Sequence, residues 1–182
     1  MGVLIRLDPK SHLVLKRFRF RSAEGPIVQD AGSLWIPSDA WVTRIVLATN
    51  TETVIPLPGG EAGPGSGQGY AIASNLVATP GKVWIGNPAG IYWIEEATNK
   101  ATRVPGTMIG DLDQVGNISV AAGEGSVFAR TGGSTVTRID ATTARVLGHY
   151  PAAGGGGDVA VGFGSLWVAN FGIDTTWRIP LG

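Results

Sequence analysis

The stretch Gly164-Ser165-Leu166-Trp167-Val168 decides the fold, because its pattern of glycine, polar, aliphatic, aromatic and apolar residues occurs four times in the chain. The other copies are Gly32-Ser33-Leu34-Trp35-Ile36, Gly81-Lys82-Val83-Trp84-Ile85 and Gly125-Ser126-Val127-Phe128-Ala129. Their glycines are separated by 49, 44 and 39 residues. Repetition at about 40 to 45 residues is typical of units that each build one small sheet of four strands. The sequence therefore predicts four successive copies of one supersecondary unit.

A second phrase follows each copy in phase with the first. It reads Thr43-Arg44-Ile45, Tyr92-Trp93-Ile94, Thr137-Arg138-Ile139 and Trp177-Arg178-Ile179. With the apolar stretches around them, the phrases divide the units into short segments rich in β-branched and aromatic residues, bounded by Gly, Asn and Pro. No segment of ten or more residues shows helical periodicity. We predict an all-β chain, a β-propeller of about four four-stranded antiparallel blades.

The tryptophans of the repeated phrase are expected to pack between blades. Trp35, Trp84 and Trp167 recur at one position of the repeat, which favours a structural role over stacking against a ligand. Replacing Trp167 by alanine is expected to cost on the order of 3 to 5 kcal/mol. Trp41 stands outside the repeated phrase and is predicted to lie in a loop, so its replacement is expected to cost clearly less.

The blade units of this single domain fall at residues 21–58, 70–105, 117–151 and 158–182 plus 1–20. The last unit contains only three strands, so residues 13–20 are expected to pair alongside residues 175–179. This pairing lies within one chain for a ring of four blades, or between chains for a larger ring. Ile5-Arg6-Leu7 repeats the second phrase and is surplus to four blades. The alternative is a part of a ring of about six to eight blades, or a protomer that assembles such a ring with a partner.

Composition excludes several classes of function. With 43% hydrophobic and 15% charged residues, the 182-residue chain is expected to form one domain with a filled core. A net charge of zero disfavours sequence-independent nucleic-acid binding. The absence of Cys excludes disulfides, thiolate metal sites and thiol catalysis.

The sequence narrows the location of the protein to two possibilities. No apolar run approaches the roughly 18 residues of a membrane span, so none is expected. The first residues do not read as a secretory signal. We expect a cytoplasmic protein, or an extracytoplasmic one if a signal or an upstream domain has been removed.

The run from Asp158 to Asn170, with Arg138-Ile139-Asp140, resembles the bacterial YVTN-type and virginiamycin B lyase-like β-propeller repeats. The resemblance covers nearly the whole chain and implies the propeller fold. Its lyase branch implies a metal-assisted elimination that opens a cyclic depsipeptide, with His residues and a Glu on the axial face. In that branch a His usually follows a Pro at the start of an inner strand. The corresponding residues here are Pro26, Asn75, Asn117 and Asp158, so we expect no lyase activity.

Other candidate chemical groups are isolated. His149 is predicted in an outermost strand and His12 in a turn, and both are expected at the surface. Glu95 and Glu96 are adjacent in a strand and therefore point to opposite faces. The loop Gly65-Ser66-Gly67-Gln68-Gly69 lacks the lysine and helix of a phosphate-binding loop. We predict no catalytic residue, no metal site and no cofactor.

Function is expected to reside in the loops that converge on the axial face of the propeller. The candidate ligand-binding residues are Asp39, Asn87, Asp111, Asp113, Asp158 and Asn170. Asp111 and Asp113 also form a weak candidate for a cation site, although they lack the spacing of a calcium loop. We predict a non-enzymatic binding or scaffold module for a small ligand or a protein partner. The alternatives are a metal-dependent lyase or hydrolase, and a structural protomer that assembles a larger ring as a homo-oligomer.

Overall fold

The computed structural model describes residues 2–20, 25–38, 40–59, 75–87, 89–107 and 118–182. Blade 1 consists of β3 (Val28–Asp30), β4 (Ser33–Pro37), β5 (Trp41–Val46) and β6 (Thr51–Pro56). Blade 2 consists of β7 (Leu76–Thr79), β8 (Lys82–Asn87), β9 (Gly90–Glu95) and β10 (Lys100–Arg103). Blade 3 consists of β11 (Val120–Gly123), β12 (Ser126–Gly132), β13 (Thr135–Asp140) and β14 (Val146–Pro151). The predicted all-β architecture of four-stranded antiparallel sheets is confirmed.

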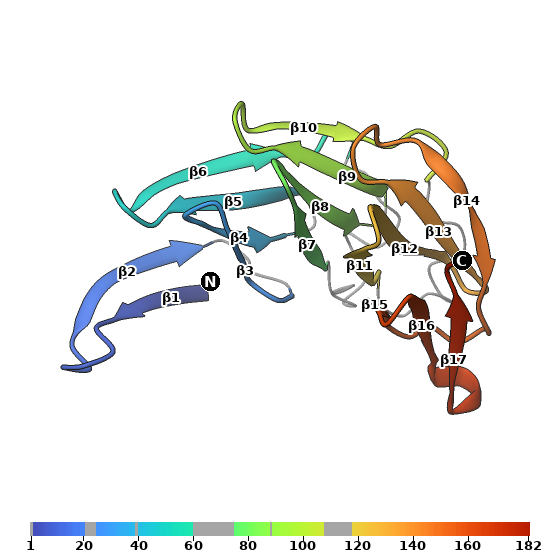
Figure 1. Cartoon of the computed structure of the whole chain (residues 1–182). Helices are drawn as coiled ribbons and strands as arrows, with labels where there is room; N and C mark the ends of the chain where they lie inside the picture. Colours follow the sequence, from blue (N-terminus) through green and yellow to red (C-terminus); the bar gives the residue numbers. More distant parts are fainter. Residues whose placement is uncertain (1, 21–24, 39, 60–74, 88, 108–117) are drawn as a thin grey trace.

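Two smaller sheets flank these blades. Blade 4 contains the three strands β15 (Val159–Gly162), β16 (Ser165–Asn170) and β17 (Thr175–Pro180). The N-terminal hairpin contains β1 (Gly2–Leu7) and β2 (Val14–Phe20). The blades follow one another in chain order along an open arc, with the hairpin at one end and blade 4 at the other (Figure 1). The first strands of successive blades contact each other on the inner side of this arc.

The glycine of the repeated phrase is required by the turn between the first and second strands of each blade. Gly32, Gly81, Gly125 and Gly164 have φ values of 71°, 76°, 68° and 62°. Residues with a Cβ atom rarely adopt this left-handed region, whereas glycine adopts it without strain. The repeated glycine thus marks the tight hairpin that begins each blade.

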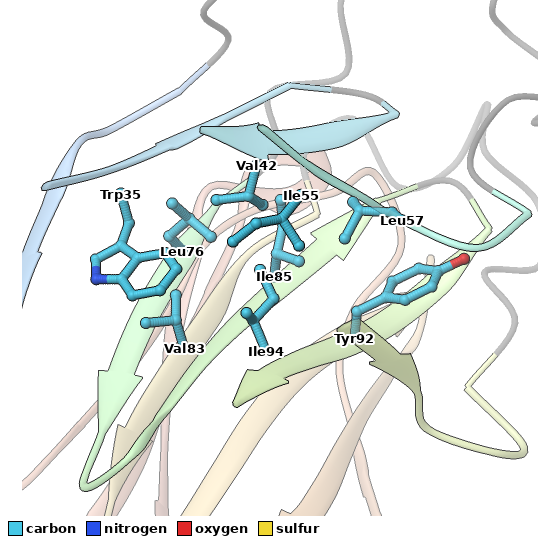
Figure 2. Close-up of a cluster of buried hydrophobic side chains, with 9 residues drawn as sticks. All are labelled: Trp35, Val42, Ile55, Leu57, Leu76, Val83, Ile85, Tyr92 and Ile94. Atoms are coloured by element: carbon cyan, nitrogen blue, oxygen red, sulfur yellow. The ribbon is translucent and has the colours of Figure 1, made fainter. Parts of the chain in front are cut away.

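Each interface between blades buries the aromatic residue of the repeated phrase. Trp35, Val42, Ile55 and Leu57 of blade 1 pack against residues of blade 2 (Figure 2). The residues of blade 2 in this cluster are Leu76, Val83, Ile85, Tyr92 and Ile94. Since a single sheet cannot bury its own apolar face, every blade depends on its neighbours for stability.

A cation lies over an aromatic ring in every blade and joins the second strand to the third. In blades 1, 3 and 4, an arginine of the third strand donates through Nε to the serine of the repeated phrase, at 2.9 Å each time. The sets are Arg44 with Ser33 and Trp35, Arg138 with Ser126 and Phe128, and Arg178 with Ser165 and Trp167. Blade 2 exchanges the residue types, because Lys82 replaces the serine and lies over Trp93, which replaces the arginine. Blade 2 therefore keeps a cation–π contact between its second and third strands, with the cation and the ring exchanged between the two strands.

The N-terminal segment does not close a four-bladed ring within the chain, contrary to that prediction. β2 pairs with β1, whereas β17 pairs with β16. Pairing β2 with the nearby β1 closes a far shorter loop than pairing it with β17, and therefore costs less chain entropy. Phe18 of β2 is also buried against Ile36 and Ile45 of blade 1. The predicted unit of residues 158–182 plus 1–20 is thus two separate sheets in one chain, and pairing between chains stays a prediction.

The tryptophan assignments need two corrections. Trp35 and Trp84 are fully buried, as the repeat predicts. Trp167 is only partly buried. Its neighbours Leu166 and Val168 pack toward blade 3, and no described blade covers the other face of blade 4 (Figure 1). Trp41 is the first residue of β5 and not a loop residue. The repeated phrase therefore predicts the position of an aromatic residue in a blade, but its burial depends on the next blade.

Candidate functional site

The loop face is the side of the arc where second strands end and fourth strands lead to the next blade. Antiparallel pairing brings these two kinds of connection to the same edge of every blade. Asn87, Asp158 and Asn170, predicted as ligand-binding residues, lie on this face. Asp39, Asp111 and Asp113, and the loop of residues 65–69, lie outside the residues that the structure describes. Ligand contact by any of the six predicted residues stays a prediction.

Arg130 holds together the loop face between blades 3 and 4. Its side chain is fully buried near the end of β12. Nη1 donates to the Ala169 carbonyl at 2.9 Å, and Nη2 donates to the carbonyls of Gly133 at 2.9 Å and of Ala153. Three separate segments of backbone are thus tied to one guanidinium. Such hydrogen bonds to a charged donor are about twice as strong as neutral ones.

Burial governs the electrostatics of Arg130. Removal from water lowers the pKa of its guanidinium, and the negative charge of Asp158 opposes this shift. Arginine still stays protonated, since its ordinary pKa is far above neutral pH. The same part of the repeat holds the small residues Pro37, Gly86 and Ala169 in the other blades. Arg130 was not among the predicted residues. The sequence did carry a signal for it, because Arg130 is a large residue at a position that is small in the other three blades.

The two predicted asparagines are buried and hold loops. Asn170 Oδ1 accepts a hydrogen bond from the Ala153 amide at 2.8 Å, and its Nδ2 donates to the Val168 carbonyl at 3.3 Å. Asn87 Oδ1 accepts from the Ala89 amide at 2.9 Å. The residue after the Arg130 position is polar and buried in all four blades. These residues are Ser38, Asn87, Thr131 and Asn170.

Glycines allow two segments of backbone to approach closely beneath this surface. A Cβ atom on Gly157 would lie 2.0 Å from the Ala169 carbonyl oxygen, and one on Gly155 would lie 2.5 Å from the Gly172 Cα. The Phe171 amide donates to the Gly156 carbonyl at 3.1 Å. The glycine run of residues 154–157 therefore fits the loop between blades 3 and 4 against the end of β16.

The exposed side chains on this base include two apolar residues and two acids, Asp158 and Asp174. Phe171 is 54% exposed and Ile173 is 51% exposed, and both belong to a 3-10 turn that follows β16. Asp158 is exposed at the start of blade 4, and its carbonyl accepts a hydrogen bond from the Ala169 amide at 2.9 Å. This arrangement presents apolar area beside a carboxylate, as a surface for another polypeptide does.

Outside the loop face, the described titratable residues form no reaction centre. His149 lies on the outermost strand β14, where its Nδ1 is 3.1 Å from Thr137 Oγ1. His12 occupies a turn with φ of 59°. Among the described residues, no group of three or more His, Asp or Glu side chains could hold a metal ion.

One acidic pair lies between blades 1 and 2. Burial raises the pKa of Glu96, and the Asp30 carboxylate raises it further through a hydrogen bond and its charge. The positive charge of Arg44 opposes this shift. Arg44 Nη1 also donates to the Glu96 carbonyl at 2.5 Å. Glu96 thus retains its proton to higher pH than an ordinary glutamate.

Comparison with known proteins identifies the fold. No protein-family model matches the chain, and no curated protein matches its sequence. BamB from Moraxella catarrhalis superimposes with a TM-score of 0.71 and 11% identity, over 98% of this chain and 51% of that chain. The computationally designed Ika4 protein gives 0.67 and 11%, over 90% of this chain and 94% of that chain. Hsv2 from Kluyvelomyces marxianus gives 0.67 and 8%, over 99% and 54%.

These similarities concern structure and not sequence. The described part of the chain contains no helix long and apolar enough to cross a membrane. The chain spans about half the length of BamB and of Hsv2. These structural neighbours are β-propeller proteins, and the fold of this chain is accordingly that of a β-propeller.

Proposed function

We propose that the chain is a non-enzymatic binding or scaffold module that recognises a protein partner through its loop face. The observation that carries this proposal is the exposure of Phe171 and Ile173 beside Asp158, on backbone held by buried polar groups. Aromatic side chains supply much of the binding energy in protein interfaces. A rigid base reduces the entropy lost on binding.

The polar groups of this face support binding rather than catalysis. Arg130 and Asn170 are buried and already bonded to backbone, so they are not available to act on a substrate. The resemblance of residues 158–170 to YVTN-type repeats favours membership of that family. A small ligand bound by Asp158 and its neighbouring loops is the second form of the same proposal.

The test uses random peptides displayed on phage as the probe. The protein is immobilised, the strongest peptide is selected, and its affinity is measured by isothermal titration calorimetry. Replacing both Phe171 and Ile173 by alanine is expected to weaken the affinity about tenfold or more, because it removes the apolar contact area.

Phe163→Ala is the matched control. Phe163 is 95% exposed and lies in the turn before β16, at the opposite end of that strand from Phe171. Its replacement is expected to leave the affinity unchanged. An affinity that depends on Phe163 and not on Phe171 and Ile173 contradicts the proposal, as does a selection that enriches no peptide.

A further inference from the structure

The N-terminal hairpin reproduces the outer half of a blade. In β1 and β2, Arg6 pairs with Lys16 and Leu7 pairs with Val14, with a bulge between the two pairs. In β13 and β14 of blade 3, Arg138 pairs with Gly148 and Ile139 pairs with Val146, with a bulge at the same place. β1 therefore corresponds to a third strand, and β2 corresponds to a fourth strand.

The turn of the hairpin agrees with this assignment. Asp8 accepts hydrogen bonds from the amides of Lys10 and Ser11 at 2.9 and 2.7 Å. Asp140 accepts them from the amides of Thr142 and Thr143 at 3.0 and 2.7 Å. The residue two positions before the next strand has a left-handed φ in both turns, 59° at His12 and 58° at Ala144. Both turns thus have the same backbone path.

An arginine side chain that forms hydrogen bonds to the neighbouring blade shows which place the hairpin occupies. Arg44 of blade 1 donates to the Glu96 carbonyl and the Asn99 Oδ1 of blade 2, in the turn between the third and fourth strands. Arg6 donates to the corresponding acceptors of blade 1, the Leu47 carbonyl at 2.8 Å and the Asn50 Oδ1 at 2.9 Å. In a closed ring another blade precedes blade 1. The hairpin therefore occupies the place of the third and fourth strands of that preceding blade.

Blade 4 carries the complementary half. β17 is also a third strand, and Arg178 donates through Nε to Ser165. The structure gives the terminal nitrogens of Arg178 no acceptor among the described residues. β17 has β16 on one side and no described strand on the other. The partly buried Trp167 lies on the uncovered side of this sheet, beneath Arg178.

We propose that two copies of this chain close one ring by exchanging strands. β17 of each copy takes the place of β1 beside β2 of the other copy, so that β2 becomes the fourth strand of its partner's blade 4. Arg178 then donates to the Leu47 carbonyl and the Asn50 Oδ1 in place of Arg6. Each copy supplies four blades, and the pair forms a ring of eight.

Two observations support a second copy as the occupant. The chain covers 51% of BamB and 54% of Hsv2, so two copies have about the length of one such propeller. The hairpin covers blade 1 through Phe18, Ile36 and Ile45, but leaves Ile27 before the innermost strand exposed. Blade 4 provides the inner strands that are missing from this place.

In the exchange β1 is the strand that is displaced from β2, because it is less firmly packed than β17. Ile5 and Leu7 are 42% and 53% exposed. Their counterparts in β17 are Trp177 and Ile179, which pack against the core between blades 3 and 4. Exchange therefore removes an exposed strand and leaves the better-packed one in place.

Engineered cysteines test the exchange in a chain that has none of its own. Val3 and Arg19 are cross-strand partners in the hairpin, so the oxidised V3C/R19C variant holds β1 on β2. We expect the unmodified protein to have twice the chain mass of 18.8 kDa in light scattering, and the oxidised V3C/R19C variant to have that mass once. Reduction of the variant is expected to restore the dimer.

A second pair of cysteines tests the register. The correspondence of β17 with β1 places Thr175 opposite Arg19 of the other copy, although the two lie at opposite ends of the arc within one chain (Figure 1). The oxidised R19C/T175C variant is expected to form a covalent dimer. The matched R19C/T176C variant is expected to form much less, because adjacent strand residues point to opposite faces.

The two arginines are expected to have opposite effects. Arg178→Ala should weaken dimerisation about tenfold or more, since it removes a charged donor to two acceptors. Arg6→Ala should strengthen it or leave it unchanged, since Arg6 competes for those acceptors. A monomeric unmodified protein, an oxidised V3C/R19C variant that stays dimeric, or an R19C/T175C variant without covalent dimer overturns the proposal.

Discussion

Trp84→Ala and Trp167→Ala together test whether each blade is stabilised by the blade that follows it. Both residues hold the aromatic position of the repeat. Trp84 is fully buried and its Nε1 donates to Thr79 Oγ1 at 2.8 Å. Trp167 is partly buried, and its Nε1 donates to the Gly162 carbonyl at 3.2 Å. The substitution is chemically the same, so the difference between the two results reports the coverage by a neighbouring blade.

The expected costs follow from this burial. Removing a fully buried tryptophan costs about 3 to 5 kcal/mol through lost contact area and cavity formation. Since one face of Trp167 is uncovered, we expect about half of that cost, about 1.5 to 2.5 kcal/mol. This replaces the larger cost predicted from the repeat alone.

Urea unfolding followed by far-UV circular dichroism measures both free energies without relying on tryptophan emission. The substitutions are made in the oxidised V3C/R19C background, so that no second copy covers Trp167. Equal costs for Trp84 and Trp167 in that background would show that coverage by the following blade does not determine the cost.

Three further outcomes are expected. Arg130→Met should destabilise the chain by about 2 to 4 kcal/mol in urea unfolding, because it leaves three backbone carbonyls without their donor. The control Arg145→Met, at an exposed arginine, should change the stability by about 0.5 kcal/mol or less. Equal costs for the two substitutions would count against the role of Arg130 in anchoring the loops. The raised pKa of Glu96 means that the folded state holds its proton more tightly than the unfolded state, so its stabilising effect is present below the ordinary pKa of 4.5 and is lost as the pH rises through the folded pKa. The melting temperature of Glu96→Gln should therefore exceed that of the unmodified protein increasingly as the pH rises through this range, and a constant difference contradicts the shift. No magnesium-dependent opening of a cyclic depsipeptide should be detected by mass spectrometry, since none of the four inner-strand starts carries His; ring opening that His149→Ala abolishes would overturn this expectation.

The repeated phrases predict the blades because each blade needs the same local chemistry. The glycines allow the left-handed turn, and the arginine, serine and aromatic residues make one cross-strand contact. These are local requirements, and they appear in the sequence at fixed spacing. The order of the strands within each blade could therefore be predicted.

The choice of partner for β2 could not be predicted in the same way. Ile5-Arg6-Leu7 and Trp177-Arg178-Ile179 carry the same third-strand pattern, so the sequence offers β2 two equivalent neighbours. Chain entropy and the packing of Phe18 on blade 1 decide between them within one chain. Neither effect is visible in a periodic pattern.

The loop face was predicted only in part. Asn87 and Asn170 were predicted from their polar character, but their amides satisfy buried backbone groups. Arg130 was missed because an arginine in a strand ordinarily indicates solvent exposure. The apolar Phe171 and Ile173 were not among the predicted ligand-binding residues, all of which are polar. Burial is a property of the assembled blades and cannot be read from one position.

Hydrogen exchange of the unmodified protein at increasing concentration tests the exchange of strands most directly. We predict that amides of β17, residues 175–180, gain protection as the dimer forms, while amides of β1, residues 2–7, lose it. β2, residues 14–20, should stay protected throughout, because it has a partner strand in both states. Protection of β1 and β17 that does not change with concentration, in a protein whose mass doubles, would mean that the dimer forms without the exchange of these strands.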